Sequence, residues 1–354
     1  QTAPGDGVCL KDRSFQLNEA RHVIIRYLRF RLGDENKPRP SGVDVITTND
    51  VDHVIFDHIT ASWGIDGIHD LRRGGNFTLQ WSIYAESLDD SLHEKGPHAM
   101  LASFRDLTGG VSIHHNLLAS GRERHPTLGG SPRTDPQAIA DFRNNVVYNL
   151  SGATNLANCR INAIANTYRP GPDATSRMPL AVKAENPGST RVFLSGNVFE
   201  GRDDYTRDNF SAIDVDHWAR GGKYLKTTLE AIRQDRENDC GDATPRTQRA
   251  EDAYELVLQH AGASLHRDAA DARVVQGVRD QTNRKIDSQS EVGGWPLLRS
   301  LPAPVDSDRD GMPDHWETSR GLDPRDPSDR NADVDGDGYT NLEVYLNSLC
   351  PSPY

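Results

Sequence analysis

One pattern dominates the first two hundred residues: a short run of alternating apolar residues that returns seven times. The copies are HVIIRYLRF (22–30), HVIFDHITA (53–61), NFTLQWSIY (76–84), GVSIHHNLL (110–118), IADFRNNVVY (139–148), RINAIANTY (160–168) and RVFLSGNVF (191–199). Their first inward-facing residues, the anchors, lie 21 to 34 residues apart and are Val23, Val54, Phe77, Val111, Ala140, Ile161 and Val192. Such intervals are typical of a solenoid with loops of variable length. A β-sandwich is the alternative, but its turns recur about every 8–12 residues.

Asparagine recurs at one place in this pattern. Four copies carry it five residues after the anchor, at Asn116, Asn145, Asn166 and Asn197. Stacked asparagines can hydrogen-bond to one another and to the backbone where it turns. The sequence therefore predicts an all-β solenoid of parallel strands over residues 1–201, with these asparagines near one corner of successive turns.

The chain changes character after Gly201. Strong helix formers at helical spacing occur in 223–235 and 250–261, which favours helices there. Because an open solenoid end exposes unpaired backbone groups, we expect residues 202–300 to form a partly helical segment that covers the solenoid. Residues 1–300 would then be one domain, and LPAPV (301–305) would link it to a separate module at 306–354.

That module is acidic, with 12 acidic and 4 basic residues in a chain of net charge −12. Six residues fit positions 1, 3, 5, 6, 9 and 12 of an EF-hand-type calcium loop, namely Asp306, Asp308, Asp310, Gly311, Asp314 and Glu317. The pattern returns at Asp333, Asp335, Asp337, Gly338 and Asn341, but position 12 is Val344 and Glu343 stands one place early. The second loop would therefore bind weakly or use Glu343 in a shifted geometry. A solvated acidic tail is the alternative, although random acidity would not place glycine at position 6 twice.

Three polar clusters follow one another within the solenoid: DGIHD (66–70), HEKG (93–96) and RERHP (122–126). Each lies at or just after the end of a short β-branched run, so stacked strands would bring all three to one face. Two carboxylates, a lysine and an arginine side by side suit calcium-assisted chemistry on an acidic sugar polymer.

With these motifs the chain resembles polysaccharide lyase family 1, the pectate-lyase-like group. The resemblance is carried by QTAPGDGVCL (1–10), VIIRYLRFRLGD (23–34), VIFDH (54–58), DGIHD (66–70), HEKG (93–96), HHNLL (114–118), RHP (124–126), DFRNNVVYN (141–149), NTYRPGP (166–172) and AYELVLQHAGASL (253–265). It implies a right-handed parallel β-helix that cleaves polygalacturonate (pectate) by β-elimination with Ca²⁺. The tail resembles the thrombospondin type 3 or EF-hand-like modules of secreted bacterial polysaccharide-degrading enzymes, which implies secretion.

The resemblance also implies roles for single residues. The aspartate of SGVDVI, Asp44, matches the family's first calcium carboxylate, and DGIHD matches its acidic pair at Asp66 and Asp70. Lys95 of HEKG matches a lysine that binds the substrate carboxylate, and Arg124 of RHP matches the family's base.

One position departs from the family pattern. Many members carry another arginine a few residues after the proline of RHP, but Thr127 and Gly129 stand there in this chain. Arg133 is the candidate replacement. Arg122, within RERHP, is a further candidate for substrate binding.

The chemistry of β-elimination agrees with these roles. Removing the C5 proton beside a sugar carboxylate adds negative charge to a group that is already negative. Calcium takes about 6–8 oxygen ligands, so three aspartates would leave room for the substrate carboxylate, and Lys95 would add a point charge to it. Arginine is normally protonated far above neutral pH, but nearby calcium and lysine would favour its neutral form. We therefore expect alkaline activity.

Two other functions stay open. Asp89 and Asp90 suggest a polygalacturonase-like hydrolase with paired carboxylates, although adjacent residues on a strand point to opposite faces. A non-catalytic β-helix that binds polysaccharide is the other, with Asp66 and Asp70 merely capping turns. We assign His58, His114 and His115 to stacking or hydrogen bonding, since no Ser or Cys nucleophile shares their spacing.

The expected partner is an acidic polysaccharide of the homogalacturonan or pectate type. No apolar run approaches the eighteen or so residues of a membrane span, so we expect a soluble chain. We also expect a monomer with no nucleic-acid partner.

Overall fold

The computed structural model describes residues 5–35, 42–183, 185–222, 224–241 and 244–350. The first four residues of the QTAPGDGVCL motif lie outside the described residues. The chain divides into a larger unit, Cys9–Pro296, and a smaller unit formed by Gln1–Val8 and Leu297–Tyr354. Within the described ranges, no helix is long and apolar enough to cross a membrane.

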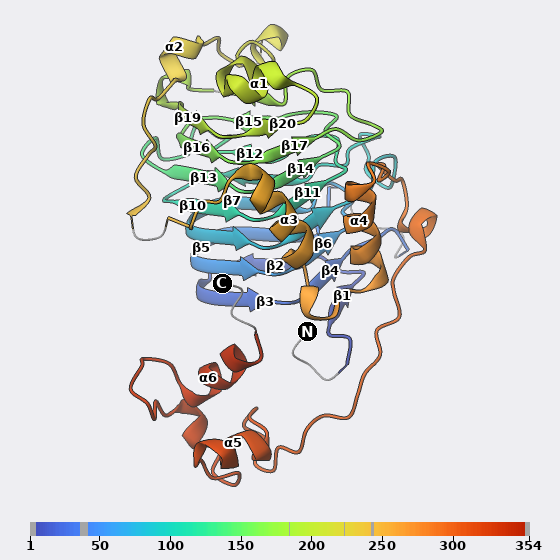
Figure 1. Cartoon of the computed structure of the whole chain (residues 1–354), viewed down its shortest axis with the longest axis vertical. Coiled ribbons are helices and arrows are strands. Elements are labelled where there is room, and N and C mark those ends of the chain that lie inside the picture. Colours follow the sequence, from blue (N-terminus) through green and yellow to red (C-terminus); the bar gives the residue numbers. More distant parts are fainter. Residues whose placement is uncertain (1–4, 36–41, 184, 223, 242–243, 351–354) are drawn as a thin grey trace. The chain divides into compact units, whose positions relative to one another are not determined.

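The larger unit is a right-handed parallel β-helix whose strands form an 8-stranded and a 13-stranded sheet (Figure 1). We call the 8-stranded sheet the flank sheet, and we divide the 13-stranded sheet, at the long strands β5 and β7, into a repeat sheet and a site sheet. The flank sheet contains β1 (Cys9–Lys11), β4 (Arg29–Arg31), β6 (Thr60–Ser62), β8 (Ile83–Ala85), β11 (Leu117–Ala119), β14 (Val146–Tyr148), β17 (Thr167–Arg169) and β20 (Val198–Phe199). The repeat sheet contains β3 (Arg21–Arg26), the second halves of β5 (Ile46–Asp57) and β7 (His69–Gln80), and β10 (Val111–His114), β13 (Ile139–Arg143), β16 (Arg160–Ile164) and β19 (Arg191–Ser195). The site sheet contains β2 (Phe15–Asn18), the first halves of β5 and β7, β9 (Ala102–Arg105), β12 (Thr127–Leu128), β15 (Thr154–Leu156), β18 (Leu180–Val182) and β21 (Ile213–Asp214). The expectation of stacked parallel strands is confirmed.

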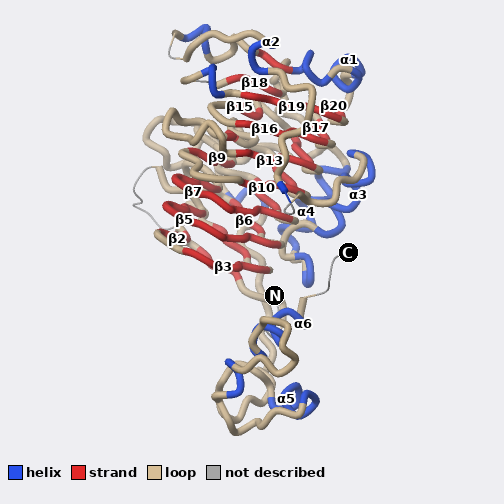
Figure 2. The backbone as a smooth tube through the Cα atoms, turned by 90° about the vertical axis from the view of Figure 1, so that its left-hand side faces the viewer, coloured by secondary structure: helices blue, strands red, loops and turns tan. Residues whose placement is uncertain are grey.

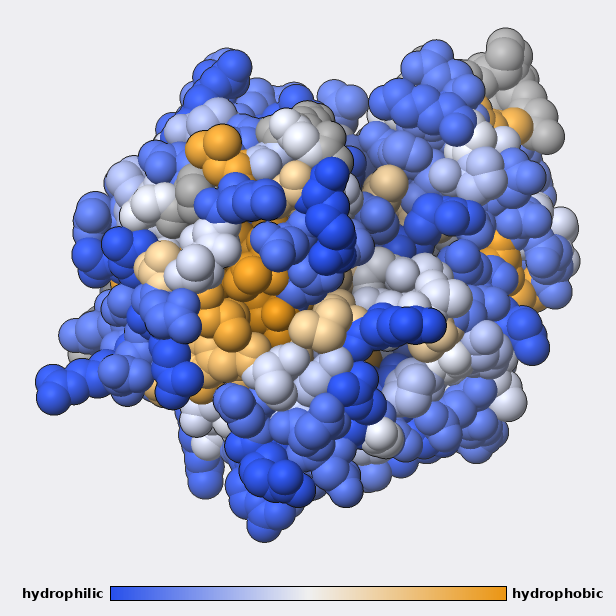
Figure 3. All heavy atoms as spheres, turned by 90° about the horizontal axis from the view of Figure 1, so that it is seen from above, coloured by the Kyte–Doolittle hydropathy of each residue, from blue (hydrophilic) through white to orange (hydrophobic). Residues whose placement is uncertain are grey.

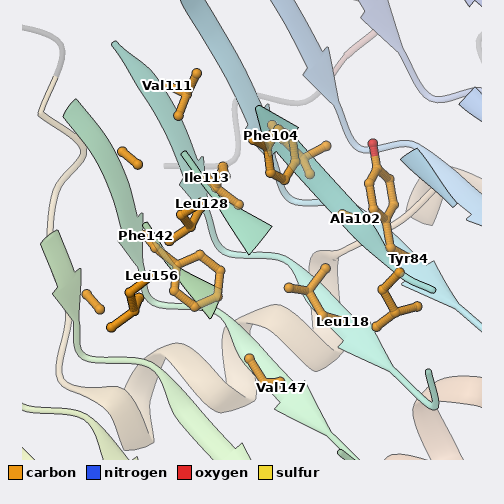
Figure 4. Packing of buried hydrophobic residues seen from close by; sticks show 14 of the residues in the cluster. Tyr84, Ala102, Phe104, Val111, Ile113, Leu118, Leu128, Phe142, Val147 and Leu156 are labelled. Carbon is orange, nitrogen blue, oxygen red and sulfur yellow. The ribbon is translucent and has the colours of Figure 1, made fainter. Parts of the chain in front are cut away.

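The seven anchors pair in one continuous register along the repeat sheet. The partners are Val23 with Val54, Val54 with Phe77, Phe77 with Val111, Val111 with Ala140, Ala140 with Ile161, and Ile161 with Val192. Figure 4 shows Ile113 and Phe142 of this sheet beside Phe104, Leu128 and Leu156 of the site sheet. Their side chains are fully buried and help to fill the interior of the β-helix.

The asparagine ladder forms at the corner between the repeat and flank sheets. The Oδ1 atom of Asn145 accepts hydrogen bonds from the backbone and side-chain nitrogens of Asn116 at 2.9 and 3.0 Å, and the same pair of bonds joins Asn145 to Asn166 and Asn166 to Asn197. The ladder continues beyond the sequence pattern to Asn209. The prediction is therefore confirmed, and the ladder is longer than the repeat indicated.

Stacked rings line the same corner. Tyr27, His58, Trp81 and His115 form one stack, with ring centroids 4.7, 6.0 and 4.2 Å apart. His114 contacts His115, their Nδ1 atoms being 2.9 Å apart. The structural role predicted for these histidines is confirmed.

Helices cover one end and one side of the β-helix (Figures 1 and 2). The helix α1 (Asp203–Arg207) and α2 (Leu229–Ile232) lie at the end beyond β19 and β20. This end is largely hydrophilic and carries a smaller hydrophobic area (Figure 3). On the side, α3 (Ala250–His260) and α4 (Ala269–Arg279) pack on the flank sheet, where Val257 and Val274 share an apolar cluster with Leu117 and Val146.

The helix expected over 223–235 is shorter than the prediction, because only Leu229–Ile232 is α-helical and residue 223 lies outside the described residues. Arg233 is extended and bridges to Val192, and the Gln234 amide donates to the Val192 carbonyl at 2.8 Å. Pairing with the last strand of the repeat sheet thus outweighs helix propensity.

Six 3-10 helices are also described: η1 (Pro187–Ser189), η2 (Asn209–Ala212), η3 (Ala219–Gly221), η5 (Ser264–His266), η6 (Gln289–Val292) and η7 (Asp329–Asn331). The last belongs to the smaller unit, which also holds α5 (Asp314–Arg320) and α6 (Asn341–Ser348). Trp316 of α5 packs edge-on against Tyr345 of α6, with ring centroids 5.1 Å apart.

Candidate active site

The site sheet stacks the predicted clusters on successive turns. Asp44 lies just before β5, Asp66 just before β7 and Arg124 just before β12. The Asp66 amide donates to the Val43 carbonyl at 3.1 Å, and the Ala102 amide donates to the Arg124 carbonyl at 2.9 Å. Parallel stacking therefore places residues from distant parts of the sequence along one edge.

The charges of Asp66 and Asp70 both act on Asp44. Burial, followed by the charges of Asp66 and Asp70, raises the pKa of Asp44 to about 8, while Arg124 and Arg105 oppose the rise. Close backbone approach at Gly67 makes room for Asp44, since a Cβ there would come within 2.7 Å of Asp44 Oδ1. A site with three carboxylates and one group this hard to ionise is suited to a divalent cation.

Two histidines lie beside Asp66, and sequence reasoning missed both. His98 Nε2 lies 2.8 Å from Asp66 Oδ1, and His93 Nε2 lies 3.9 Å from it. The two rings stack with centroids 3.9 Å apart. The Lys95 amide donates to His93 Nδ1 at 3.1 Å. Asp66 Oδ1 is buried and has no hydrogen-bond partner among the described residues, while ligand atoms of Asp66, His93 and His98 lie within 4.8 Å of one another. The signal of the two histidines in the sequence was the pair flanking Lys95 in HEKGPH.

Lys95 and Arg124 lie close to the same histidine. Burial lowers the pKa of His98, Asp66 counteracts this, and His93, Arg124 and Lys95 lower it further. Lys95 itself is exposed, and Arg124 is partly buried. Arg124 also has φ of 63°, in the left-handed region that a side chain of this size rarely adopts. The charges of the predicted base and of the predicted substrate lysine therefore both act on His98.

Asp70 is held by two arginines that the sequence analysis did not select. Arg105 Nη2 lies 2.6 Å from its Oδ1 and Arg72 Nε lies 2.8 Å from its Oδ2. Both arginines line a hollow of about 260 Å³ together with Arg133, which is 81% exposed. The predicted replacement arginine therefore shares a hollow with the partners of Asp70, and Asp106 and Glu185 also line that hollow.

Arg122 has a partner inside the protein. Its Nε and Nη2 atoms donate to the two carboxylate oxygens of Asp89 at 2.7 and 2.9 Å, and Lys285 Nζ lies 3.1 Å from Asp89. Burial acts to raise the pKa of Asp89, but hydrogen bonds from Arg122 and Lys285 outweigh it and lower the pKa. Because a general acid must keep its proton, Asp89 is unsuited to the acid role of a hydrolase.

The two loops of the smaller unit share one geometry. Asp306 Oδ2 accepts from the Gly311 amide at 3.1 Å, and Asp333 Oδ2 accepts from the Gly338 amide at 3.0 Å. Ligand atoms of Asp306, Asp308 and Asp310 lie within 4.8 Å of one another, and so do those of Asp333, Asp335 and Asp337.

The other candidate ligands of these loops differ in position. Asp314 accepts from the amide and hydroxyl of Ser307, both at 2.7 Å, and the Asn341 side chain donates to the Asp329 carbonyl at 2.8 Å. Glu343 caps α6 by accepting from the Thr340 amide and hydroxyl at 2.8 Å. Glu317 instead turns toward Asp310 and Asp329.

Fold and site together define a right-handed parallel β-helix with a cluster of carboxylates and basic side chains on one edge. No family model matches the chain. It is 32% identical to "Probable pectate lyase C" of Aspergillus flavus and of Aspergillus oryzae, each alignment covering 100% of this chain and 78% of the relative. The solved "Structure of the thermostable pectate lyase PL 47" aligns over 72% of this chain and 65% of its own, at 14% identity and a TM-score of 0.49. The chain belongs to the pectate lyase family and is a polysaccharide lyase.

Proposed function

We propose that this lyase cleaves polygalacturonate or a closely related uronate polymer by calcium-dependent β-elimination, with Arg124 as the base. The observation that supports the proposal is that burial and the charges of Asp66 and Asp70 raise the pKa of Asp44 to about 8, while Arg124 opposes the rise. Such an arrangement is costly unless a cation or a proton neutralises it.

Asp44, Asp66 and Asp70 fit a calcium ion by their chemistry, since all three offer carboxylate oxygens. Asp70 already accepts hydrogen bonds on both oxygens, but an ionised carboxylate has about four lone-pair positions, so it can also bind a metal. When bound, the ion would neutralise the substrate carboxylate and stabilise charge that develops on it.

Arg124 would act on the substrate itself. Its neutral guanidine accepts the C5 proton, the electron pair left on C5 forms the C4–C5 double bond, and the C4–O bond to the leaving sugar breaks. The leaving oxygen takes a proton from water. The product is a 4,5-unsaturated uronide at the new non-reducing end.

Basic side chains would hold the polymer on both sides of the bond that is cleaved. Lys95 would pair with the carboxylate of the reacting sugar, and Arg133 would act with Arg72 and Arg105 on a neighbouring one. Arg122 keeps Nη1 outside its bonds to Asp89 and is proposed as a contact at the rim. The partner is therefore an acidic polysaccharide, met by a secreted monomer.

We also propose that residues 306–354 form a calcium-binding module after a linker at 301–305. Support comes from the amide-oriented aspartates of both loops. Asp314 and Asn341 remain proposed ligands, because their side-chain oxygens have lone pairs that the hydrogen bonds described above do not use. The second loop is exposed and has no acidic residue at position 12, so it would bind more weakly.

The test is ultraviolet absorbance of unsaturated uronides after polygalacturonate is added to the full chain. Absorbance should rise, a chelator should stop the rise, and added calcium should restore it. Reducing ends released without absorbance would replace the proposal with hydrolysis. If the chain binds the polymer but releases neither unsaturated uronides nor reducing ends, the proposal would be replaced by a non-catalytic polysaccharide-binding protein.

A further inference from the structure

Three carboxylates meet in the interior of the smaller unit. Ligand atoms of Asp310, Glu317 and Asp329 lie within 4.8 Å of one another. Glu317 is fully buried in the first turn of α5 and Asp310 is 2% exposed. Asp329 begins η7 and belongs to neither calcium loop of the sequence pattern.

Four oxygens of this group are buried and lack a hydrogen-bond partner among the described residues: Asp310 Oδ2, both Oε atoms of Glu317, and Asp329 Oδ1. The remaining oxygens are oriented by the backbone. The Met312 amide donates to Asp310 Oδ1 at 2.7 Å, and the Asp323 amide donates to Asp329 Oδ2 at 3.1 Å. Each aspartate is thus fixed through one oxygen and directs the other toward the group.

Burial of this kind is unfavourable without a positive charge. A buried carboxylate that is neither paired nor hydrogen-bonded is strongly destabilising. Four aspartates place negative charge near Glu317, namely Asp308, Asp310, Asp329 and Asp314. Oxygen ligands alone, including one glutamate able to bind with both oxygens, match the preference of calcium.

We infer that Asp310, Glu317 and Asp329 bind a divalent cation of the calcium type at a second centre, which shares Asp310 with the centre at Asp306, Asp308 and Asp310. This inference rests on the proposed calcium-binding role of the module and is independent of the lyase chemistry. Glu317 then serves the second centre, so the first repeat is not a closed twelve-residue loop.

The second centre connects the two repeats. Asp329 lies twelve residues after Glu317, so a cation bound to both closes the segment between them. The Asp329 carbonyl accepts from the Asn341 side chain, and the Asn341 amide donates to the Ala332 carbonyl at 2.8 Å. Cation binding at Asp329 therefore stabilises the start of α6, and the two repeats respond to calcium as one unit.

The experiment compares Asp329→Asn with Asp326→Asn in the full chain. Asparagine keeps the oxygen that receives the Asp323 amide but removes the negative charge. Asp326 is a matched control because it is exposed and caps a turn through Ser328. Trypsin cleavage at Arg320, Arg325 and Arg330, mapped by mass spectrometry during a calcium titration, reports the order of the segment.

Asp329→Asn should require about tenfold more calcium or more for half-maximal protection, and equilibrium dialysis should find one fewer calcium ion per chain. Asp326→Asn should match the wild type in both measurements. Glu317→Gln should repeat the loss, and protection of either variant at high calcium would show that the segment still folds. Lyase activity and its calcium dependence should not change.

If Asp329→Asn has the same calcium midpoint for protection and binds the same number of calcium ions as the wild type, the second centre is overturned, and the proposal that the module binds calcium stands. A wild-type chain with no calcium-dependent protection would overturn both. Neither result bears on the lyase proposal, because its readout is uronide absorbance.

Discussion

The two carboxylate clusters of this protein differ in the groups around them. In the β-helix, Asp66 lies 2.8 Å from His98, and Asp70 lies 2.6 Å from Arg105. In the smaller unit, Asp310 and Asp329 are oriented by backbone amides, and four aspartates place negative charge near Glu317. In the first cluster, Arg105 and Arg72 already balance the charge of Asp70 before an ion binds. The second cluster would depend on its ion, as a structural site does.

The β-helix also holds itself together by other means. Arg29 and Arg31 are buried in β4 and pair with Asp268 and Asp271 at the start of α4, Arg31 at 2.6 and 2.7 Å. These bonds fix the covering helix to the flank sheet. Removing calcium should therefore affect catalysis in the larger unit without unfolding it.

We call the site at Asp44, Asp66 and Asp70 the working cluster. The largest effect is expected from Arg124→Lys, which removes the proposed base from this site without removing a proposed metal ligand. Lysine keeps a positive charge but loses the planar group and its reach. Because a positioned base contributes about 10²- to 10⁴-fold, kcat should fall by that order while KM changes little. Excess calcium should not restore it. Near-normal kcat would mean that the base is another residue, with Arg122 and Lys95 next to test.

A second change targets the stability that the β-helix has without metal. Asn145→Ala removes the partner of the Asn116 amide and of the Ile113 carbonyl, and the Asn116 side chain keeps only its bond to the Leu79 carbonyl. At about 1–3 kcal/mol for each buried group, the free energy of unfolding should fall by about 3 kcal/mol or more. Urea denaturation in a chelator measures it, with exposed Asn18→Ala as the control. Equal stability of the two variants would contradict the ladder's role.

Asp66→Ala tests whether the working cluster holds calcium. Loss of a ligand should weaken calcium affinity by about 10- to 100-fold, so the calcium concentration for half-maximal rate should rise and part of the rate should return at high calcium. Tryptic protection of Arg325 should be unchanged. A rate that stays low at all calcium concentrations would place Asp66 in the chemical step instead of the metal site.

Acid should affect the two units differently. Burial lowers the pKa of His114 to about 3 and that of His115 to about 4, so the unfolded chain binds more protons below about pH 6.5. The free energy of unfolding of the β-helix should therefore fall as the pH decreases from 6.5 toward 3, by up to about 1.4 kcal/mol per pH unit for each histidine. His114→Asn should reduce this slope, whereas His315→Asn, at an exposed position of the smaller unit, should not. An unchanged slope in His114→Asn would contradict the assignment.

The sequence predicted the repeat and its register because stacking puts equivalent residues of successive turns in direct contact. Spacing alone therefore identified the anchors and the asparagines. The family resemblance selected Asp44, Asp66, Asp70, Lys95 and Arg124. The sequence did not predict four further residues of the site, because neighbouring turns bring them together and no periodicity marks them. These residues are His93, His98, Arg72 and Arg105. Asp329 was missed for the same reason, since it lies outside both loop patterns.

The smallest effect is expected from removing residues 306–354, which tests whether the two clusters work separately. The residues proposed for catalysis lie in Cys9–Pro296, and the proposed structural calcium sites lie in the smaller unit. Turnover per folded molecule and its calcium dependence should therefore stay close to those of the full chain. Uronide absorbance measures activity, and the urea midpoint checks folding. If a folded truncation loses turnover, the smaller unit contributes to the site, and the separation between a working and a structural cluster fails.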